Sequence, residues 1–157
     1  MQRFMALAVV FTFSLSGCLS QTLSNPTPEE TMTLETTPCN GMIILCHRTY
    51  DNVTFPETHN AHATHQDGIY YPASNHQTGL TAQWQAGMRA FMIDTHYANP
   101  NSQEAESVRL CHGSQSDLYS PCYYGEVDAI DWLSNLKTLM ESQPRDVVTL
   151  LIESHVS

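Results

Sequence analysis

The sequence predicts an α/β fold in which short strands alternate with helical segments, and three observations carry this prediction. Residues 146–153 hold the strongest strand signal, a run of β-branched and aliphatic side chains. Residues 126–143, just before it, repeat apolar side chains every three or four positions, as an amphipathic helix does. A mostly apolar run over 88–95 is typical of another buried strand. Alternation of this kind indicates parallel βα units.

The other elements follow from local signals. Val53–Phe55 are β-formers that lead into a proline, which predicts a short first strand. Residues 59–78 are polar with glycine and proline breakers, so we expect mostly loop. A short helix over 80–86 then has Thr78 as its expected cap and Gly87 as its end. Another short strand is expected over 108–111, before the helix over 126–143.

The helix over 126–143 should bury one face in the core. Acidic residues near its start suit the helix dipole, and Pro144 ends it. The residues expected on the buried face are Val127, Ile130, Leu133, Leu136 and Met140, widened by Trp132 and Leu139. Met88 and Met92 are likewise expected in the core.

The length and charge of the chain limit its function. At 157 residues there is room for one domain. The formal charge of −10, from six basic and sixteen acidic residues, argues against nucleic-acid binding. It also argues against binding to an anionic membrane through a cluster of basic residues. An acidic protein that handles an anionic substrate must supply positive charge locally, and a metal ion would do this.

The first residues predict export. Residues 1–18 combine Arg3, a short apolar stretch and small residues before Cys18, which suggests a bacterial lipoprotein signal with Cys18 lipidated. An ordinary secretory signal with an incidental cysteine is the alternative. Residues 19–38, rich in Thr, Ser, Pro and Glu, should form a tether, and the domain should occupy residues 39–157.

Export suggests that the other four cysteines form disulfides, for which three pairings exist. Cys39 with Cys46 and Cys111 with Cys122 would each close a short local loop, and we expect these two pairs. No C-x-x-C pair is present, which argues against structural zinc.

Polar residues suited to chemistry stand at the expected strand ends. His59 and Asn60 follow the first strand, Asp94 lies in the second, His112 follows the third and Glu153 ends the last. In α/β barrels such positions hold the working residues. Two histidines can transfer protons near neutral pH, and amide or carboxylate oxygens suit a hard cation such as Ca²⁺ or Mg²⁺. This set is suited to cleaving a phosphodiester.

The ordered motifs resemble the X region of phosphatidylinositol-specific phospholipase C, and most closely the exported, X-domain-only relatives. They run from Cys39 nearly to the end of the chain. The segments that resemble the family are Cys39-Asn40-Gly41, Leu45-Cys46-His47-Arg48, Val53-Thr54-Phe55, Thr58-His59-Asn60-Ala61, Gly87–Thr95, Leu110-Cys111-His112-Gly113 and Val147–Glu153.

The resemblance implies a TIM (β/α)8 barrel in which an inositol hydroxyl attacks phosphorus and diacylglycerol leaves. By position, His59 matches the family's first histidine, which acts in proton transfer and transition-state stabilisation. His112 matches the second, which protonates the leaving oxygen. Asn60, Asp94 and Glu153 match the metal ligands of the calcium-dependent branch, which implies Ca²⁺, with Mg²⁺ as the alternative. An arginine replaces the cation near the Asp94 position in the metal-independent branch.

Two departures from the family pattern shape the expectations. Met92 stands where the calcium-dependent branch has a glutamate, so one ligand is absent. A complete barrel takes about 250 residues, so only its first half is expected here, as part of a longer reading frame. The expected partners are a phospholipid or inositol phosphodiester substrate and, through a lipid anchor, the membrane. The alternative is a non-catalytic module on the same barrel that binds phospho-inositol or glycan groups at the cell surface.

Four further histidines allow competing interpretations. His62 and His65 follow His59 at intervals of three, which could indicate zinc, but no helix surrounds them and solvated loop positions are favoured. His96 and His155 could line the site or lie at the surface. A glycerophosphodiester hydrolase would need paired acidic residues soon after His59, and these are missing.

Overall fold

The computed structural model describes residues 7–10, 37–98, 108–113 and 122–156. Within these ranges lie six strands, two α-helices and two 3₁₀ turns. In chain order they are β1 (Leu7–Val10), η1 (Ile43–His47), η2 (Tyr50–Asn52), β2 (Glu57–Thr58), α2 (Leu80–Gln85), β3 (Ala90–Tyr97), β4 (Val108–Leu110), β5 (Val127–Asp128), α3 (Ala129–Ser142) and β6 (Thr149–Ser154).

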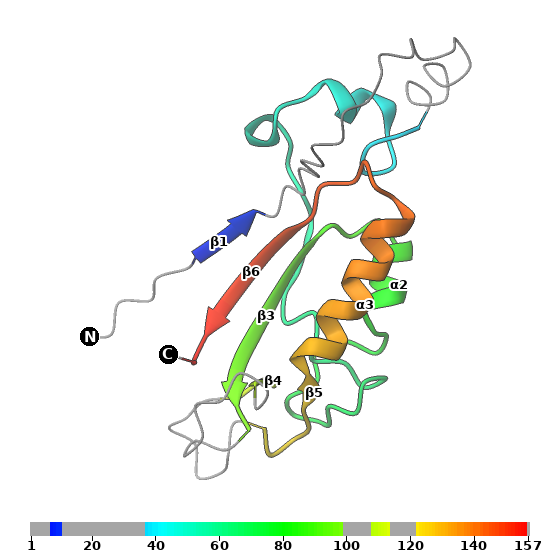
Figure 1. The fold of residues 1–157 in the computed structure, drawn as a ribbon. Coiled ribbons are helices and arrows are strands. Elements are labelled where there is room, and N and C mark those ends of the chain that lie inside the picture. Colours follow the sequence, from blue (N-terminus) through cyan, green and yellow to red (C-terminus); the bar gives the residue numbers. More distant parts are fainter. Residues whose placement is uncertain (1–6, 11–36, 99–107, 114–121, 157) are drawn as a thin grey trace, which may run out of the picture.

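Strand β3 is the centre of a curled, mixed sheet (Figure 1). β6 pairs with it in parallel along one edge. The other edge of β3 pairs first with β2, in parallel, and then with β4, which is antiparallel and pairs in turn with β5. The parallel β2–α2–β3 and β3–α3–β6 units confirm the α/β prediction. The antiparallel arrangement of β4 and β5, which lie between β3 and α3 in the chain, was not expected.

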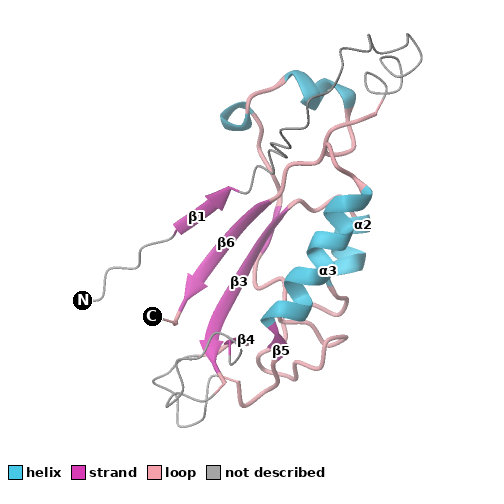
Figure 2. Cartoon of the chain, viewed as in Figure 1, coloured by secondary structure: helices cyan, strands magenta, loops and turns pink. Residues whose placement is uncertain are grey.

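The core lies between β3, β6 and the two helices, which both cover the same face of the sheet (Figure 2). Phe91 and Ile93 of β3 point into it, because alternate residues of a strand face opposite sides. The ring of Phe91 meets Trp132 of α3 edge-on, with centroids 6.2 Å apart. Residues 92 and 94 consequently belong to the other face of β3.

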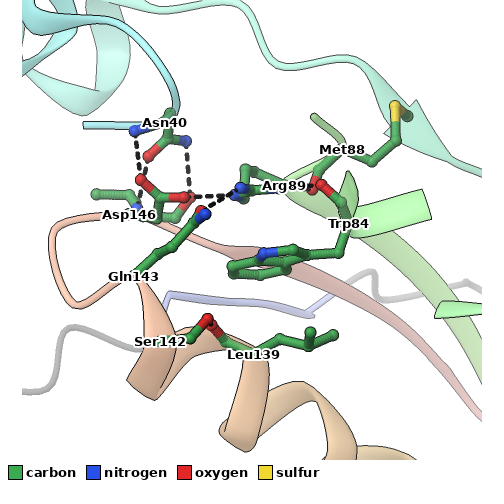
Figure 3. Close-up of polar contacts among 9 residues, drawn as sticks. Asn40, Trp84, Met88, Arg89, Leu139, Ser142, Gln143 and Asp146 are labelled. Atoms are coloured by element: carbon green, nitrogen blue, oxygen red, sulfur yellow. Dashed lines mark hydrogen bonds and ion pairs between the residues drawn. The ribbon is translucent and has the colours of Figure 1, made fainter. Parts of the chain in front are cut away.

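A buried ion pair joins the entrances of β3 and β6 (Figure 3). Arg89 Nε lies 2.7 Å from an Asp146 carboxylate oxygen, and the two side chains are 7% and 3% exposed. Arg89 also donates to Gln143 and to the carbonyl of Trp84, whose ring stacks under the guanidinium at 3.7 Å. Asn40 completes the cluster, because its backbone N–H donates to Asp146.

Both expected disulfides are present. Cys39–Cys46 closes the loop that contains Asn40, and Cys111–Cys122 closes the segment that follows β4. The Asn40 side chain exchanges hydrogen bonds of 2.7 and 2.9 Å with the backbone of Val147, so the first loop is fastened beside the start of β6.

Two element boundaries differ from prediction. The strand expected over Val53–Phe55 lies instead at Glu57–Thr58 (β2), because Phe55 stacks on Tyr50 at a centroid distance of 5.5 Å and pairing with β3 begins only after Pro56. The α2 cap is Gly79 rather than Thr78, and the Gly79 N–H donates to Gln66. Gly87 follows the helix with φ 91°, as a terminator should.

Helix α3 begins later and buries a narrower face than predicted. Asp128 caps it by accepting hydrogen bonds from the backbone N–H of residues 130 and 131, while Val127 belongs to β5. Ile130 and Leu133 are 57% and 42% exposed, so placing them in the core was wrong. The fully buried stripe is Ala129, Trp132 and Leu136.

Part of the expected signal segment pairs with the sheet. Leu7–Val10 form β1, which runs antiparallel to β6 along the edge that β3 leaves open. Cys18 and residues 19–36 of the expected tether lie outside the described ranges. No helix among the described residues is long and apolar enough to cross a membrane.

Replacing Arg89 with methionine should destabilise the chain by about 3–5 kcal/mol, because Asp146 is left as a buried, uncompensated charge. Urea unfolding measures this loss. The matched control is Lys137→Met, which removes an exposed pair with Glu141 and should cost under about 1 kcal/mol. Equal losses in the two variants would contradict a structural role for the buried pair.

Candidate functional site

The strand-end residues meet beside the carboxyl half of β3. Asp94 lies opposite Glu153 in the parallel β3–β6 register. Asn60 follows β2, and the next N–H, that of Ala61, donates to the Met92 carbonyl of β3 at 2.7 Å. His112 arrives from the other direction: β4 runs back along β3, so the residues after it come to the level of Asp94. The structure thus brings the predicted site residues together.

Asn60 connects a carboxylate to a histidine. Its side chain is buried and its backbone is left-handed, with φ 48°, a conformation that asparagine adopts more easily than most residues. In the amide orientation that satisfies the surrounding groups, Nδ2 donates to both carboxylate oxygens of Asp94 at 3.2 Å, and Oδ1 accepts from His112 Nε2 at 3.2 Å. In that orientation the three side chains form a continuous Asp94–Asn60–His112 chain, and in the reverse orientation the amide oxygen lies against the Asp94 oxygens.

His112 is held at both ring nitrogens. Nδ1 donates to the Ala73 carbonyl at 3.0 Å, and Nε2 faces Asn60. The preceding residue, Cys111, is fully buried and bonded to Cys122, which anchors the backbone at this point. Because Ala73 contributes a backbone atom, no side-chain signal in the sequence could have identified it.

His59 is exposed and contacts Met92. Its Nδ1 lies 2.9 Å from the Met92 sulfur, a weak hydrogen-bond acceptor, and its carbonyl accepts from His76 Nε2 at 2.6 Å. Met92 therefore lines the site from β3, and placing it in the core was wrong. His76 was not recognised from the sequence.

The two carboxylates of the site affect each other. Burial, and after it the nearby Glu153, raises the pKa of Asp94 to about 6, against the opposing effect of His112, His155 and His59. Glu153 in turn pairs with His155, whose Nε2 lies 3.0 Å from a carboxylate oxygen.

Two of the remaining histidines are buried beside the site. His62 is fully buried, which lowers its pKa to about 3, so a solvated loop position was wrong for it. Burial also lowers the pKa of His96 to about 4, and its ring stacks on His155 with centroids 4.2 Å apart. His65 is exposed, as expected. The interpretation of His96 and His155 as site-lining residues therefore agrees with the packing.

Two of the three expected metal ligands lie side by side. One end of the Asn60 amide is 3.2 Å from both Asp94 carboxylate oxygens and the other end is 3.2 Å from His112 Nε2, and hydrogen bonding alone assigns the nitrogen to the Asp94 side. Glu153 is engaged by His155. In the part of the chain that the structure describes, no group of three or more His, Cys, Asp or Glu side chains is arranged to hold a metal ion. Calcium takes about six to eight oxygens, more than Asn60, Asp94 and Glu153 supply, so other donors would have to complete such a site.

Asp94→Asn should change how stability depends on pH. The folded-state pKa of about 6 against an ordinary 3.8 means that the folded chain retains a proton which the unfolded chain has released. The contribution of Asp94 to stability should therefore be fully present below about pH 4 and fall by about 3 kcal/mol as the pH rises through 6. The buried His62 and His96 contribute in the opposite direction, so the test is the difference between two variants: urea unfolding at several pH values should show that the stability of Asp94→Asn relative to the wild type rises as the pH rises from about 4 to about 7. The exposed Asp51→Asn serves as control, and parallel wild-type and Asp94→Asn curves would contradict the buried charge.

The PI-PLC X family model matches residues 45–156. An uncharacterized secreted protein of Arthroderma benhamiae is 31% identical over 139 residues, which are 88% of this chain and 27% of that protein. The chain thus spans about a quarter of that relative's length, and no solved structure matches it significantly. The family match contains His59, Asn60, Asp94, His112 and Glu153 in order, and the chain therefore belongs to the PI-PLC X family.

Proposed function

We propose that this chain carries the catalytic histidines of a phosphoric diester hydrolase that cleaves phosphatidylinositol-type lipids. Family membership supports a phosphodiesterase-type activity. The observation that carries the proposal is the chain from Asp94 through Asn60 to His112, beside which the exposed His59 lies on the same face of β3. A (β/α)8 barrel is the proposed scaffold, of which the β2–α2–β3 and β3–α3–β6 units would be the first part.

The proposed reaction divides proton transfer between the two histidines. His59 Nδ1 is occupied by Met92, so Nε2 is the nitrogen that would take the proton of the attacking inositol hydroxyl. The hydroxyl oxygen then bonds to phosphorus. As the bond from phosphorus to the glycerol oxygen breaks, His112 Nε2 would give that oxygen a proton. The products are a cyclic inositol phosphodiester and diacylglycerol, and the two histidines exchange roles when water opens the ring.

The fixed Nδ1 of His112 supports the acid role. Because the Ala73 carbonyl accepts from Nδ1, that nitrogen keeps its hydrogen and the exchangeable proton belongs to Nε2. Orientation of an imidazole by one fixed hydrogen bond is the arrangement that general acid–base catalysis requires. The scheme assigns no step to the expected divalent cation, which Asn60, Asp94 and Glu153 would help to hold if it binds.

Met92 favours an alternative function, that of a binding module without catalytic activity. The sulfur against His59 stands where a ligand would be expected, which supports a non-catalytic surface module that binds phospho-inositol or glycan groups. Such a module would bind inositol phosphate without turning over a phosphodiester, so an activity assay separates the two proposals.

His112→Gln should lower kcat/KM by about 10²–10⁴-fold, the usual contribution of a positioned general acid. The measurement is diacylglycerol release from phosphatidylinositol vesicles by the full-length protein. His47→Gln is the matched control, because His47 is exposed on η1, away from the site, and its activity should be unchanged. If the wild type has no activity, or if His112→Gln keeps all of it, the enzymatic proposal fails and the binding module remains.

Export is proposed from the apolar segment before Cys18 and from the relative described as secreted. Mass spectrometry of the mature N-terminus should find cleavage near Cys18, with a lipid-modified cysteine if the signal is of the lipoprotein type. In that case Cys18→Ala should move the protein from the membrane fraction to the soluble fraction. An intact N-terminus on cell-associated protein would contradict export by this segment.

A further inference from the structure

We infer that Asn52 carries an N-linked glycan. The inference rests on the proposed export of the chain and is independent of the proposed catalysis. The acceptor tripeptide, Asn52-Val53-Thr54, has the Asn-x-Ser/Thr pattern that is glycosylated in exported proteins. Of the eight asparagines in the sequence, Asn52 alone fits this pattern. Asn25 also has a threonine two residues later, but the residue between them is Pro26, which the pattern excludes.

The acceptor tripeptide lies in an exposed loop and has a suitable backbone. Asn52 is the last residue of η2, and its N–H donates to the Thr49 carbonyl at 3.0 Å. Val53 is extended, with φ −129° and ψ 135°. The residues on either side of an extended residue face the same way, and Asn52 and Thr54 are both exposed while Val53 is half-buried. The acceptor amide and the hydroxyl that a transferase recognises are therefore presented together at the surface.

The loop that contains the tripeptide is fixed on both sides of it. The Tyr50 hydroxyl shares a hydrogen bond of 2.8 Å with the hydroxyl of Thr149, at the start of β6. Phe55 stacks on the ring of Tyr50, with centroids 5.5 Å apart. A glycan is a bulky, hydrated group that has to remain at the surface. Because Tyr50 and Phe55 make the contacts with the fold, Asn52 can carry such a group without disturbing them.

The loop lies at the end of the sheet opposite the candidate site. Thr149, to which Tyr50 is hydrogen-bonded, is the first residue of β6, whereas Glu153 lies four residues further along, opposite Asp94. At about 3.3 Å per residue, these two levels of the strand are about 13 Å apart. Figure 1 shows the same separation, with the 3₁₀ turns beyond the start of β6 and away from the carboxyl end of β3. A glycan on Asn52 would leave the site, and the lipid surface that it would approach, unobstructed.

A glycan at this end would also hydrate an unusually apolar part of the surface. Met42, Ile43 and Ile44 follow one another in the first disulfide loop and are 57%, 48% and 53% exposed, and Tyr50 is 45% exposed. Exposed apolar groups of this kind favour association between molecules. A bulky hydrophilic sugar at the same end of the molecule opposes such association, so the modification has a physical benefit at this position.

The modification is a group transfer to the side-chain amide. A bond forms between Asn52 Nδ2 and the anomeric carbon of a sugar that is carried on a lipid phosphate. The bond from that carbon to the phosphate oxygen breaks, and the lipid phosphate leaves with the electron pair and takes up the proton that Nδ2 loses. The sugar donor and the transferase belong to the export route, so only exported molecules should be modified.

Mass spectrometry of the exported protein, isolated from the cells that produce it, tests the inference. Trypsin should release residues 49–89 as one peptide, because this segment contains no lysine or arginine before its last residue. The peptide should carry added sugar mass, and fragmentation should locate that mass on Asn52 and not on Asn60 or Asn75, which lack the pattern. A bare Asn52 in protein whose N-terminus has been cleaved would overturn the inference and leave export intact. A bare Asn52 behind an intact N-terminus would overturn both.

Substitutions within the tripeptide separate glycan transfer from other modifications of the loop. Asn52→Gln removes the acceptor and Thr54→Ala removes only the hydroxyl, and both should lose the sugar mass completely. Thr54→Ser keeps a hydroxyl and should keep the sugar. Asn135→Gln, at an exposed position on α3 outside the pattern, is the control and should change nothing. Sugar mass that persists in Thr54→Ala would contradict the inference, and none of these measurements depends on turnover, so they stand even if the enzymatic proposal fails.

Discussion

The buried pair of Arg89 and Asp146 is the interaction on which the rest of the structure depends. It joins the residue before β3 to the segment before β6, the two strands that carry both site carboxylates. Burying two charges is costly unless every donor and acceptor is matched. Gln143, Asn40 and the carbonyl of Trp84 supply these partners, so helix α3, the first disulfide loop and helix α2 are all fastened at one point.

Along β3, alternate side chains face opposite sides of the sheet, so the residues that stabilise the core are separated from those that line the site. Phe91 and Ile93 pack against the helices, and the intervening Met92 and Asp94 face the site. The parallel register of β3 and β6 places Asp94 opposite Glu153 through backbone pairing alone. Like charges so placed repel each other, which is one reason why the pKa of Asp94 is raised.

Local signals predicted the elements well and the contacts between them less well. The apolar runs and Gly87 located β3, β6 and helix α2, because these features act over a few residues. The exposed Ile130 shows the limit: periodicity defines an apolar stripe, while the partners that cover it are set by the whole fold. The site residues were recognisable by type. The link from Asn60 to His112 was not, since it depends on β4 turning back along β3.

The net charge of −10 poses a problem for any anionic substrate, and the local pairing reduces it. Each site carboxylate lies against a polar neighbour: Glu153 accepts from His155, and Asp94 contacts the Asn60 amide, which can donate to it. A hydrogen-bonded carboxylate repels a phosphate less than a bare one does, because the donor's positive end lies against it. His112 lies beside them, with Nδ1 on the Ala73 carbonyl and Nε2 against the Asn60 amide. The chain's own imidazole and amide groups can therefore create a local environment favourable to phosphate within an acidic protein.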